Sequence, residues 1–337
     1  MRMVRERAFA RAGLVGNPSD GYQGRTISMS VRNFYAQAVL YEWEDLELLP
    51  SSEDQSRFAS LHDLVQDVHL HGYYGGIRLV KASIKKFWEY CRQQGIPLEA
   101  GNFSIRYQTN IPRQVGLAGS SAIIVATLRG LARWYGVEIP LRVQPSLALA
   151  VETEELGIAA GLQDRVIQVY EGLVYMDFTP ERTAEIHGFR CGEYERLDPR
   201  LLPPLYLAYS DARAEPTEIV HGELRSRWLR RDPKVLRAMH ELAELTLMGR
   251  EALLAGDHRR FGQIMNRNFD VRTTICDIQP AHRQMVEVAR RAGATAKFAG
   301  SGGAIVGSYA GEAEWVRLER ELAAIGCTVI RPQCAAE

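Results

Sequence analysis

The chain opens with two apolar stretches on either side of a break rich in glycine and proline. Apolar, β-branched and aromatic residues fill "FARAGLVG" before the break and "TISMSVRNFYAQAVLYEW" after it, a composition typical of strands. Pro18, Gly21 and Gly24 interrupt the pattern between the two stretches and would break any helix there. We therefore expect two strands at the amino end, joined by a segment that is not helical.

Helical spacing follows further along the chain. Apolar positions recur at helical spacing over residues 76–94 and stop at Gly95. The alternating stretch "NFSIRYQTNIP" predicts a strand after this helix, and two more helices are predicted over residues 120–135 and 145–156. The first half of the chain is therefore predicted to be α+β.

The pattern weakens between residues 180 and 203, a stretch that holds Pro180, Pro199, Pro203 and Pro204. Lost periodicity together with several prolines is typical of a connection. We predict an amino-terminal domain over residues 1–190 and a carboxyl-terminal domain over residues 200–337.

The second half alternates strands with helices. The stretch "PLYLAYSDA" predicts a strand, and helices are predicted over about residues 217–275 and over residues 281–291. A strand pair around the glycine turn of "TAKFAGSGGAIVGSYA", a helix over residues 313–325 and a strand in "CTVIRP" complete the chain. With the inserted helices set aside, the order is β–α–β–β–α–β, which predicts a ferredoxin-like half.

Composition limits the classes of partner. Among 337 residues, 41 Lys and Arg balance 41 Asp and Glu, so no global field would attract nucleic acid or an anionic membrane. The five cysteines are scattered and lack CxxC spacing, which favours reduced thiols in the cytoplasm. No run reaches the roughly 18 apolar residues of a membrane span. We expect a cytoplasmic protein whose partners are neither nucleic acid nor membrane.

Three glycine-rich loops are the first candidates for chemistry: "GLVGNPSDGYQG", "QVGLAGSSA" and "AGSGGAIVG". None has the lysine of a P-loop, and none opens a dinucleotide-binding βαβ unit. The middle loop leads directly into a helix at Ser120 and Ser121. Two interpretations of this stretch stay open, namely a serine that caps the helix and an anion site at the helix N-terminus.

Carboxylates form the second candidate group. Glu152 lies on a predicted helix, and Asp164 follows it by 12 residues on a predicted turn. At helical spacing Glu152 and Glu155 would share a face, while Glu154 would point away. The group is either a solvated acidic surface or part of a site, because Asp164 lies among small and apolar residues where a buried carboxylate needs a partner.

The three loops, in this order, resemble the signature motifs of the GHMP kinases of sugars and small molecules. The middle motif is complete as P-x-x-x-G-L-x-x-S-S over residues 112–121. The details "GNPSDGYQGRTIS", "GYYGG", "TNIPRQ", "LGIAAGLQDRV" and "KFAGSGGA" are similar to the plant-type glucuronokinases, which phosphorylate D-glucuronate at its anomeric oxygen. The resemblance implies a two-domain α+β GHMP kinase fold.

The resemblance also implies that the protein uses ATP and Mg²⁺. The ATP phosphates would lie on the middle and last loops, at Pro112, Gly116, Leu117, Ala118, Gly119, Ser120, Ser121, Gly300, Ser301 and Gly302. Ser120, Ser121 and Glu152 would hold Mg²⁺, an ion that prefers oxygen ligands. Tyr73 and Tyr74 would either cover the adenine or join the core.

On the acceptor side, the resemblance makes Asp164 the catalytic residue, as a base or an orienting group beside the anomeric hydroxyl. The first loop would line the sugar with Asn17, Asp20 and Tyr22. Many GHMP kinases carry a Glu-His pair where this chain has Asn17-Pro18, and this departure agrees with the glucuronokinase pattern.

A sugar acid also needs a donor for its carboxylate, and arginine suits it because the planar guanidinium meets both oxygens. The candidates near the predicted acceptor site are Arg11, Arg25, Arg113, Arg165 and Arg272. Arg11 and Arg165 could instead pair with a neighbouring aspartate, and Arg113 could serve the phosphates. We therefore favour Arg272 first and Arg25 second.

The predicted function is an ATP-dependent sugar 1-kinase that converts D-glucuronate to D-glucuronate 1-phosphate between the two halves of the chain. Two alternatives stay open. One is a 1-kinase for a neutral hexose, a pentose or a heptose, and the other is a GHMP-fold protein that binds a ligand without catalysis.

Overall fold

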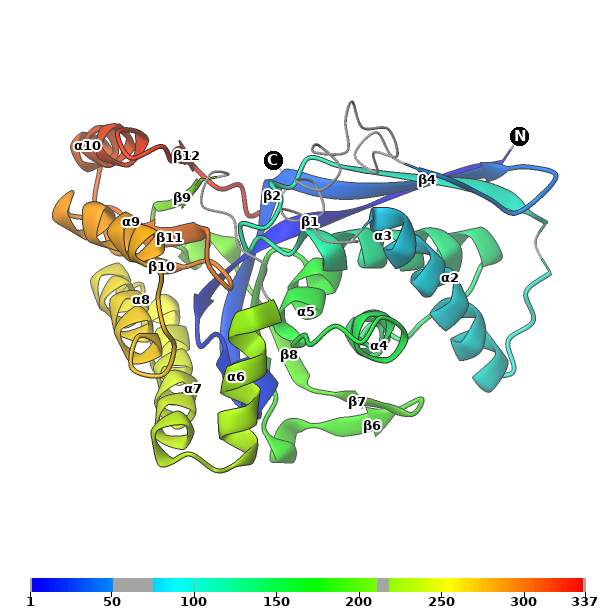
Figure 1. Ribbon diagram of the computed structural model, residues 1–337, viewed down its shortest axis with the longest axis horizontal. Helices are drawn as coiled ribbons and strands as arrows, with labels where there is room; N and C mark the ends of the chain where they lie inside the picture. The colour runs from blue at the N-terminus through cyan, green and yellow to red at the C-terminus, as the bar shows by residue number, and fades with distance from the viewer. Residues whose placement is uncertain (1, 51–74, 100, 211–217, 336–337) are drawn as a thin grey trace, which may run out of the picture.

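The computed structural model describes residues 2–50, 75–99, 101–210 and 218–335. A six-stranded sheet and a four-stranded sheet organise it, and helices pack against both (Figure 1). The six-stranded sheet has the order β3-β4-β2-β5-β8, with β1 also paired to β2. Its strands are β1 (Met3–Val15), β2 (Arg25–Glu42), β3 (Glu47–Leu49), β4 (Phe103–Thr109), β5 (Leu173–Asp177) and β8 (Glu193–Leu197).

The two strands predicted at the amino end are confirmed as the long antiparallel pair β1 and β2. The break between them folds into a short 3-10 helix, η1 (Ser19–Tyr22). A register shift at Gly13 and Val15 ends the regular pairing of β1 just before this turn. The first glycine loop therefore lies at one end of the long β1–β2 pair.

Helices cover one face of this sheet (Figure 1). They are α2 (Gly76–Gln93), α3 (Gly119–Tyr135), α4 (Gln144–Ala150), the π-helical turn η2 (Val151–Glu155) and α5 (Gln163–Tyr170). A Cβ on Gly130 would come within 2.6 Å of Leu40, so this glycine lets α3 lie directly on β2. Close packing of α3 on the ribbon fixes where its N-terminus begins.

The second sheet has the order β10-β11-β9-β12 with every neighbouring pair antiparallel. Its strands are β9 (Leu205–Tyr209), β10 (Lys297–Phe298), β11 (Ala304–Ser308) and β12 (Thr328–Ile330), and its helices are α6 (Glu218–Leu229), α7 (Pro233–Leu254), α8 (His258–Arg272), α9 (Pro280–Arg291) and α10 (Glu312–Ala323). This is the predicted β–α–β–β–α–β order with extra helices inserted after its first strand.

Two predictions about elements are wrong. The helix expected over residues 145–156 becomes π-helical from Val151 onward, and Asp164 lies in the first turn of α5 rather than on a turn. The weakly patterned segment also holds more structure than predicted. It contains η3 (Pro180–Arg182), the hairpin β6 (Ala184–Ile186) and β7 (Phe189–Cys191), the edge strand β8, and η4 (Pro199–Leu201).

The chain leaves the first sheet after Leu197 and enters the second at Leu205. Side chains from both halves nevertheless share one apolar cluster: Gly249 of α7 lies near Val15, Ile27 and Phe261. The boundary between two domains stays a prediction. Within the described residues, no helix is both long and apolar enough to cross a membrane.

Candidate active site

The three glycine loops meet at one place. The Gly13 N–H of the first loop donates to the Ala299 carbonyl at 2.7 Å, just before the last loop. A Cβ on Gly300 would lie 2.1 Å from the Gly116 carbonyl, and a Cβ on Gly116 would lie 2.6 Å from the Gly302 carbonyl. Backbone therefore touches backbone between the middle and last loops, which requires glycine on both sides.

The middle loop ends in the N-terminus of α3. Gln114, Gly116 and Ala118 all have positive φ, so the loop turns sharply before the helix begins at Gly119. The N-cap position is Ala118, and no side chain caps it. The serine-cap interpretation is thus excluded, and the exposed Ser120 lies beside helix N–H groups that suit an anion.

A bidentate ion pair joins the first loop region to α5. Arg11 Nε and Nη2 donate to Asp164 Oδ1 and Oδ2 at 2.6 and 2.9 Å. Arg11 Nη1 donates to the Gly116 carbonyl at 2.5 Å. Arg11 is buried, whereas the Asp164 side chain keeps 22% of its surface exposed. The carboxylate predicted to be catalytic is therefore held in one orientation and remains accessible.

Asp20 is the second carboxylate of this site. Its Oδ2 accepts the Gln163 N–H at 3.2 Å, next to Asp164 in the chain. Burial, and after it the negative charge of Asp164, raises the pKa of Asp20 from 3.8 to about 6. A Cβ on Gly161 would lie 2.2 Å from Asp20 Oδ2. The two aspartates thus share one small space, but their electrostatic environments differ.

Glu152, predicted to hold Mg²⁺, forms an ion pair with Arg165. Arg165 donates to Glu152 Oε2 from Nε at 2.7 Å and also from Nη2, and both side chains are buried. Burial raises the pKa of Glu152, an effect that the Arg165 charge opposes. Glu155 does not share the face of Glu152 as expected, because the π-helical turn directs it to Lys85 and Lys86 of α2.

The predicted magnesium ligands fit the ion only in part. Ser120 fits, since its hydroxyl is exposed in the first turn of α3. The Ser121 hydroxyl is buried and donates to the Ala118 carbonyl at 3.2 Å. Glu152 does not fit in this arrangement, because its side chain is 3% exposed and is neutralised by Arg165. Its role as a metal ligand stays a prediction.

The two arginines favoured for a substrate carboxylate already have partners within the protein. Arg272 is buried and donates to the Gly300 and Ser301 carbonyls at 2.6 and 2.8 Å. Arg25 pairs with Asp177 at 2.8 Å and lies 3.7 Å from Glu244. Arg272 therefore shapes the last loop, and Arg25 ties β2 to β5.

Sequence reasoning missed the buried lysine of the last motif. The Lys297 Nζ donates to Gly13 O, Asn17 Oδ1 and Phe298 O at 2.5, 2.6 and 2.7 Å. Burial, and then the charges of Arg272 and Arg11, holds its pKa well below the ordinary value. A lone lysine in the apolar stretch "TAKFAG" was the available signal. It locks Asn17 of the first loop to the last loop.

The other predicted sugar-side residue is Tyr22, whose buried ring packs edge-on against Trp228 of α6, with centroids 5.2 Å apart. Arg113 is exposed and makes no ion pair with any residue that the structure describes. Tyr73 and Tyr74 lie outside the described residues. Asn17, Asp20, Tyr22, Arg11 and Asp164 are thus gathered around the first loop.

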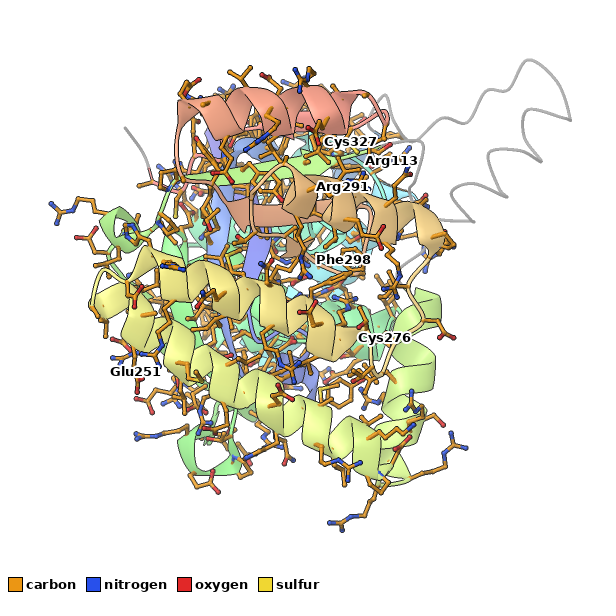
Figure 2. The ribbon with its side chains drawn as sticks, turned by 90° about the vertical axis from the view of Figure 1, so that its left-hand side faces the viewer. Arg113, Glu251, Cys276, Arg291, Phe298 and Cys327 are labelled. Atoms are coloured by element: carbon orange, nitrogen blue, oxygen red, sulfur yellow. The ribbon has the colours of Figure 1, made fainter. Side chains whose placement is uncertain are left out.

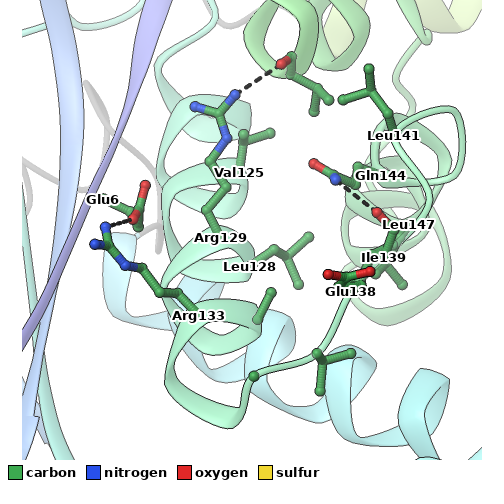
Figure 3. A pocket seen from close by; sticks show the side chains of 14 residues that line it. Glu6, Val125, Leu128, Arg129, Arg133, Glu138, Ile139, Leu141, Gln144 and Leu147 are labelled. Carbon is green, nitrogen blue, oxygen red and sulfur yellow. Dashed lines mark hydrogen bonds and ion pairs between the residues drawn. The ribbon is translucent and has the colours of Figure 1, made fainter.

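A separate pocket of about 740 Å³ lies between α3 and the segment that leads to α4 (Figure 3). It contains none of the predicted site residues. Arg129 donates hydrogen bonds to Glu171 and to three backbone carbonyls, and Arg133 forms an ion pair with Glu6. Arg129, Arg133 and Glu6 of this pocket are therefore paired within the protein, while Glu138 is exposed to solvent.

Comparison with known proteins agrees with this geometry. The family described as "GHMP kinases N terminal domain" matches residues 78–172. The chain is 44% identical to "Glucuronokinase 1" of Arabidopsis thaliana over 310 residues, which cover 90% of this chain and 84% of that protein. The chain belongs to the GHMP kinase family. Within the family it falls with the glucuronokinases, so it is a phosphotransferase.

Two further likenesses support family and fold. "Probable glucuronokinase 2" of Arabidopsis thaliana is 47% identical over 307 residues, covering 89% of this chain and 82% of that protein. The crystal structure of Lactococcus lactis galactokinase complexed with galactose superposes with a TM-score of 0.78, covering 99% of this chain and 94% of that one. At 15% identity, that structure shows the GHMP kinase fold alone. The predicted family and fold are confirmed.

Proposed function

We propose that this kinase transfers the γ-phosphoryl group of ATP to the anomeric oxygen of D-glucuronate, giving D-glucuronate 1-phosphate. The observation that carries the proposal is the Arg11–Asp164 pair beside Asp20, where the three glycine loops meet. The 44% identity to an Arabidopsis glucuronokinase supports a sugar acid as the acceptor.

The middle and last loops would bind the ATP phosphates. The uncapped N-terminus of α3 offers N–H groups to an anion. Gly116 and Gly300 carry no side chains that would cover the loop backbone, so phosphate oxygens could reach backbone donors of the two loops. Arg272 keeps the Gly300 and Ser301 carbonyls turned toward itself and away from such an anion.

The acceptor would lie against the two aspartates. Asp164, oriented by Arg11, would accept the hydrogen bond of the anomeric hydroxyl. It would take the proton as the sugar oxygen bonds to the γ-phosphorus and the bond from that phosphorus to the β,γ-bridging oxygen breaks, releasing ADP. Asp20 would accept hydrogen bonds from two further sugar hydroxyls. Phosphoryl transfer needs little covalent help, so fixed orientation and charge account for most of the catalysis. The Arg11 charge lies between Asp164 and the Gly116 carbonyl, where negative charge would otherwise accumulate.

Magnesium would accompany ATP, held by the exposed Ser120 hydroxyl and by oxygens of the nucleotide. When bound, the ion would neutralise charge on the phosphates. We also propose a cytoplasmic location, which the buried free thiols of Cys91 and Cys191 support.

A screen of ADP release tests the proposal. The full-length protein, ATP and Mg²⁺ are combined with glucuronate, galacturonate, glucose, galactose, a pentose and a heptose in turn. The proposal expects the highest kcat/KM for glucuronate. A neutral sugar that exceeds glucuronate would contradict the proposed substrate, and no stimulation by any sugar would contradict the sugar-kinase assignment.

A further inference from the structure

The site contains several cations, and almost all of their donor nitrogens bond to protein oxygens; the exception, Arg272 Nε, is buried. Arg11 and Arg165 each donate from all three guanidinium nitrogens to protein oxygens. Lys297 uses its three hydrogens on three acceptors, and Arg272 is buried against the last loop. A carboxylate that loses water in this site must meet donors that replace its hydrogen bonds. An exposed arginine on the acceptor side would supply such donors and a compensating charge.

Helix α6 supplies such an arginine. Leu224 is buried and Trp228 packs on Tyr22, so these two residues define the inward face of α6. Arg225 lies three residues before Trp228, which makes the two side chains neighbours on the helix surface. Arg225 is exposed and forms no ion pair within the described residues.

Arg227, on the same helix, fixes the position of this face. Its Nη1 donates to the Ile275 carbonyl at 2.8 Å and its Nε to Asp232 at 2.9 Å. Helix α6 is thereby tied to the segment after α8, where Cys276 lies beside it (Figure 2). Burial and then the Asp20 charge raise the pKa of Tyr22, whereas the Arg225 charge acts in the opposite direction. This agrees with a guanidinium close to the Tyr22 hydroxyl.

We propose that Arg225 binds the carboxylate of the sugar acid, next to the Tyr22 ring, and thereby makes the kinase prefer an acid to a neutral sugar. This inference rests on the proposed function. Arg113 also lacks an ion pair in the described part of the chain, but it belongs to the phosphate loop. In Figure 2, Arg113 lies above Phe298 and Cys276 lies below it. Arg225 therefore serves the acceptor, and Arg113 serves the phosphates.

The test compares kcat/KM for glucuronate and glucose in wild type, Arg225→Gln, Arg225→Lys and Arg113→Gln. Arg230→Gln is the matched control, since Arg230 is exposed and directly follows the same helix. Arg225→Gln is expected to lower kcat/KM for glucuronate about 30-fold or more and to leave glucose within about threefold. Arg225→Lys keeps the charge but loses the planar fork, so its loss should be intermediate. Arg230→Gln should match wild type.

The outcomes separate this inference from the proposed function. If wild type prefers glucuronate and Arg225→Gln keeps that preference, the inference is overturned while the function stands. A loss of preference in Arg113→Gln alone also overturns it and moves the carboxylate site to the phosphate loop. If wild type does not prefer glucuronate, the proposed substrate fails and the inference fails with it. Thermal melting of each variant checks that the fold is intact.

Discussion

Replacing Asp20 by asparagine should make the ligand-free kinase more stable at neutral pH while impairing sugar binding. Asp20 and Asp164 place two carboxylates close together, and Arg11 is bonded to only one of them. Asparagine has nearly the same shape and can still accept the Gln163 N–H with its amide oxygen. The substitution therefore removes a charge and keeps the hydrogen bond.

The size of the effect follows from the pKa. The pKa of Asp20 rises from 3.8 in the unfolded chain to about 6 in the folded protein, and each unit corresponds to about 1.4 kcal/mol. Between about pH 4 and pH 6 the folded state binds more protons than the unfolded state, so stability falls as pH rises through this window and is level above it. The raised pKa of Asp20 therefore lowers the free energy of unfolding by about 3 kcal/mol at pH 8 and by about 1 kcal/mol at pH 4.5.

Urea unfolding of wild type and Asp20→Asn without ligands, at pH 8 and pH 4.5, measures this difference. We expect the variant to gain about 2 to 3 kcal/mol at pH 8 and clearly less at pH 4.5, while kcat/KM for glucuronate falls. Asp177→Asn is the matched control with the opposite sign. Burial would raise the pKa of Asp177, but hydrogen bonds from Thr179 and Arg25 hold it below its usual value, so that variant should lose stability at pH 8.

Two results would refute the reasoning about Asp20. One is a variant that is no more stable than wild type at pH 8. The other is a gain of equal size at both pH values, which would mean that the effect does not come from the charge.

Three further variants test the remaining parts of the site. Asp164→Asn should lower kcat about 10² to 10⁴-fold with the KM for ATP little changed; near-normal turnover of a folded variant would remove Asp164 from the chemistry. Glu152→Gln should cost about 3 kcal/mol of stability, because the buried Arg165 charge would keep only the more distant Asp164, at 3.6 Å, as an anionic partner. Glu154→Gln should cost little, because Glu154 is exposed. If the Glu152 variant keeps its stability but needs more Mg²⁺, Glu152 is a metal ligand after all. Gly300→Ala would place a Cβ 2.1 Å from a carbonyl of the middle loop. It should raise the KM for ATP at least tenfold, which corresponds to a loss of about 1.4 kcal/mol of binding free energy. An unchanged KM would mean that the two loops do not both bind the phosphates.

Local pattern was sufficient to predict most of the elements and the three glycine loops of the site. The glycines of "QVGLAGSSA" and the apolar spacing after Ser120 depend on neighbouring residues only, and α3 begins one residue before the predicted start. The strand–helix order of the second half follows from the same local periodicity. Family motifs then identified Asp20 and Asp164 as members of one site.

Pairings between distant residues could not be predicted in this way. Arg11 and Asp164 are 153 positions apart, and Lys297 meets Asn17 across 280 positions. Periodicity predicts on which face of its own helix or strand a residue lies. It does not predict which other element packs against that face. The π-helical turn at Glu152 was missed for a similar reason, because its widened turn is defined by the partners of Glu152 and Glu155 on α5 and α2.

The most direct test of the account is the identity of the product. The protein is incubated with ATP, Mg²⁺ and D-glucuronate labelled with ¹³C at C1, and the mixture is followed by ³¹P and ¹³C nuclear magnetic resonance. The account predicts a new sugar phosphate whose phosphorus couples to the labelled anomeric carbon, formed by wild type and strongly reduced with Asp164→Asn. A phosphate on any other carbon, or no sugar phosphate at all, would contradict it.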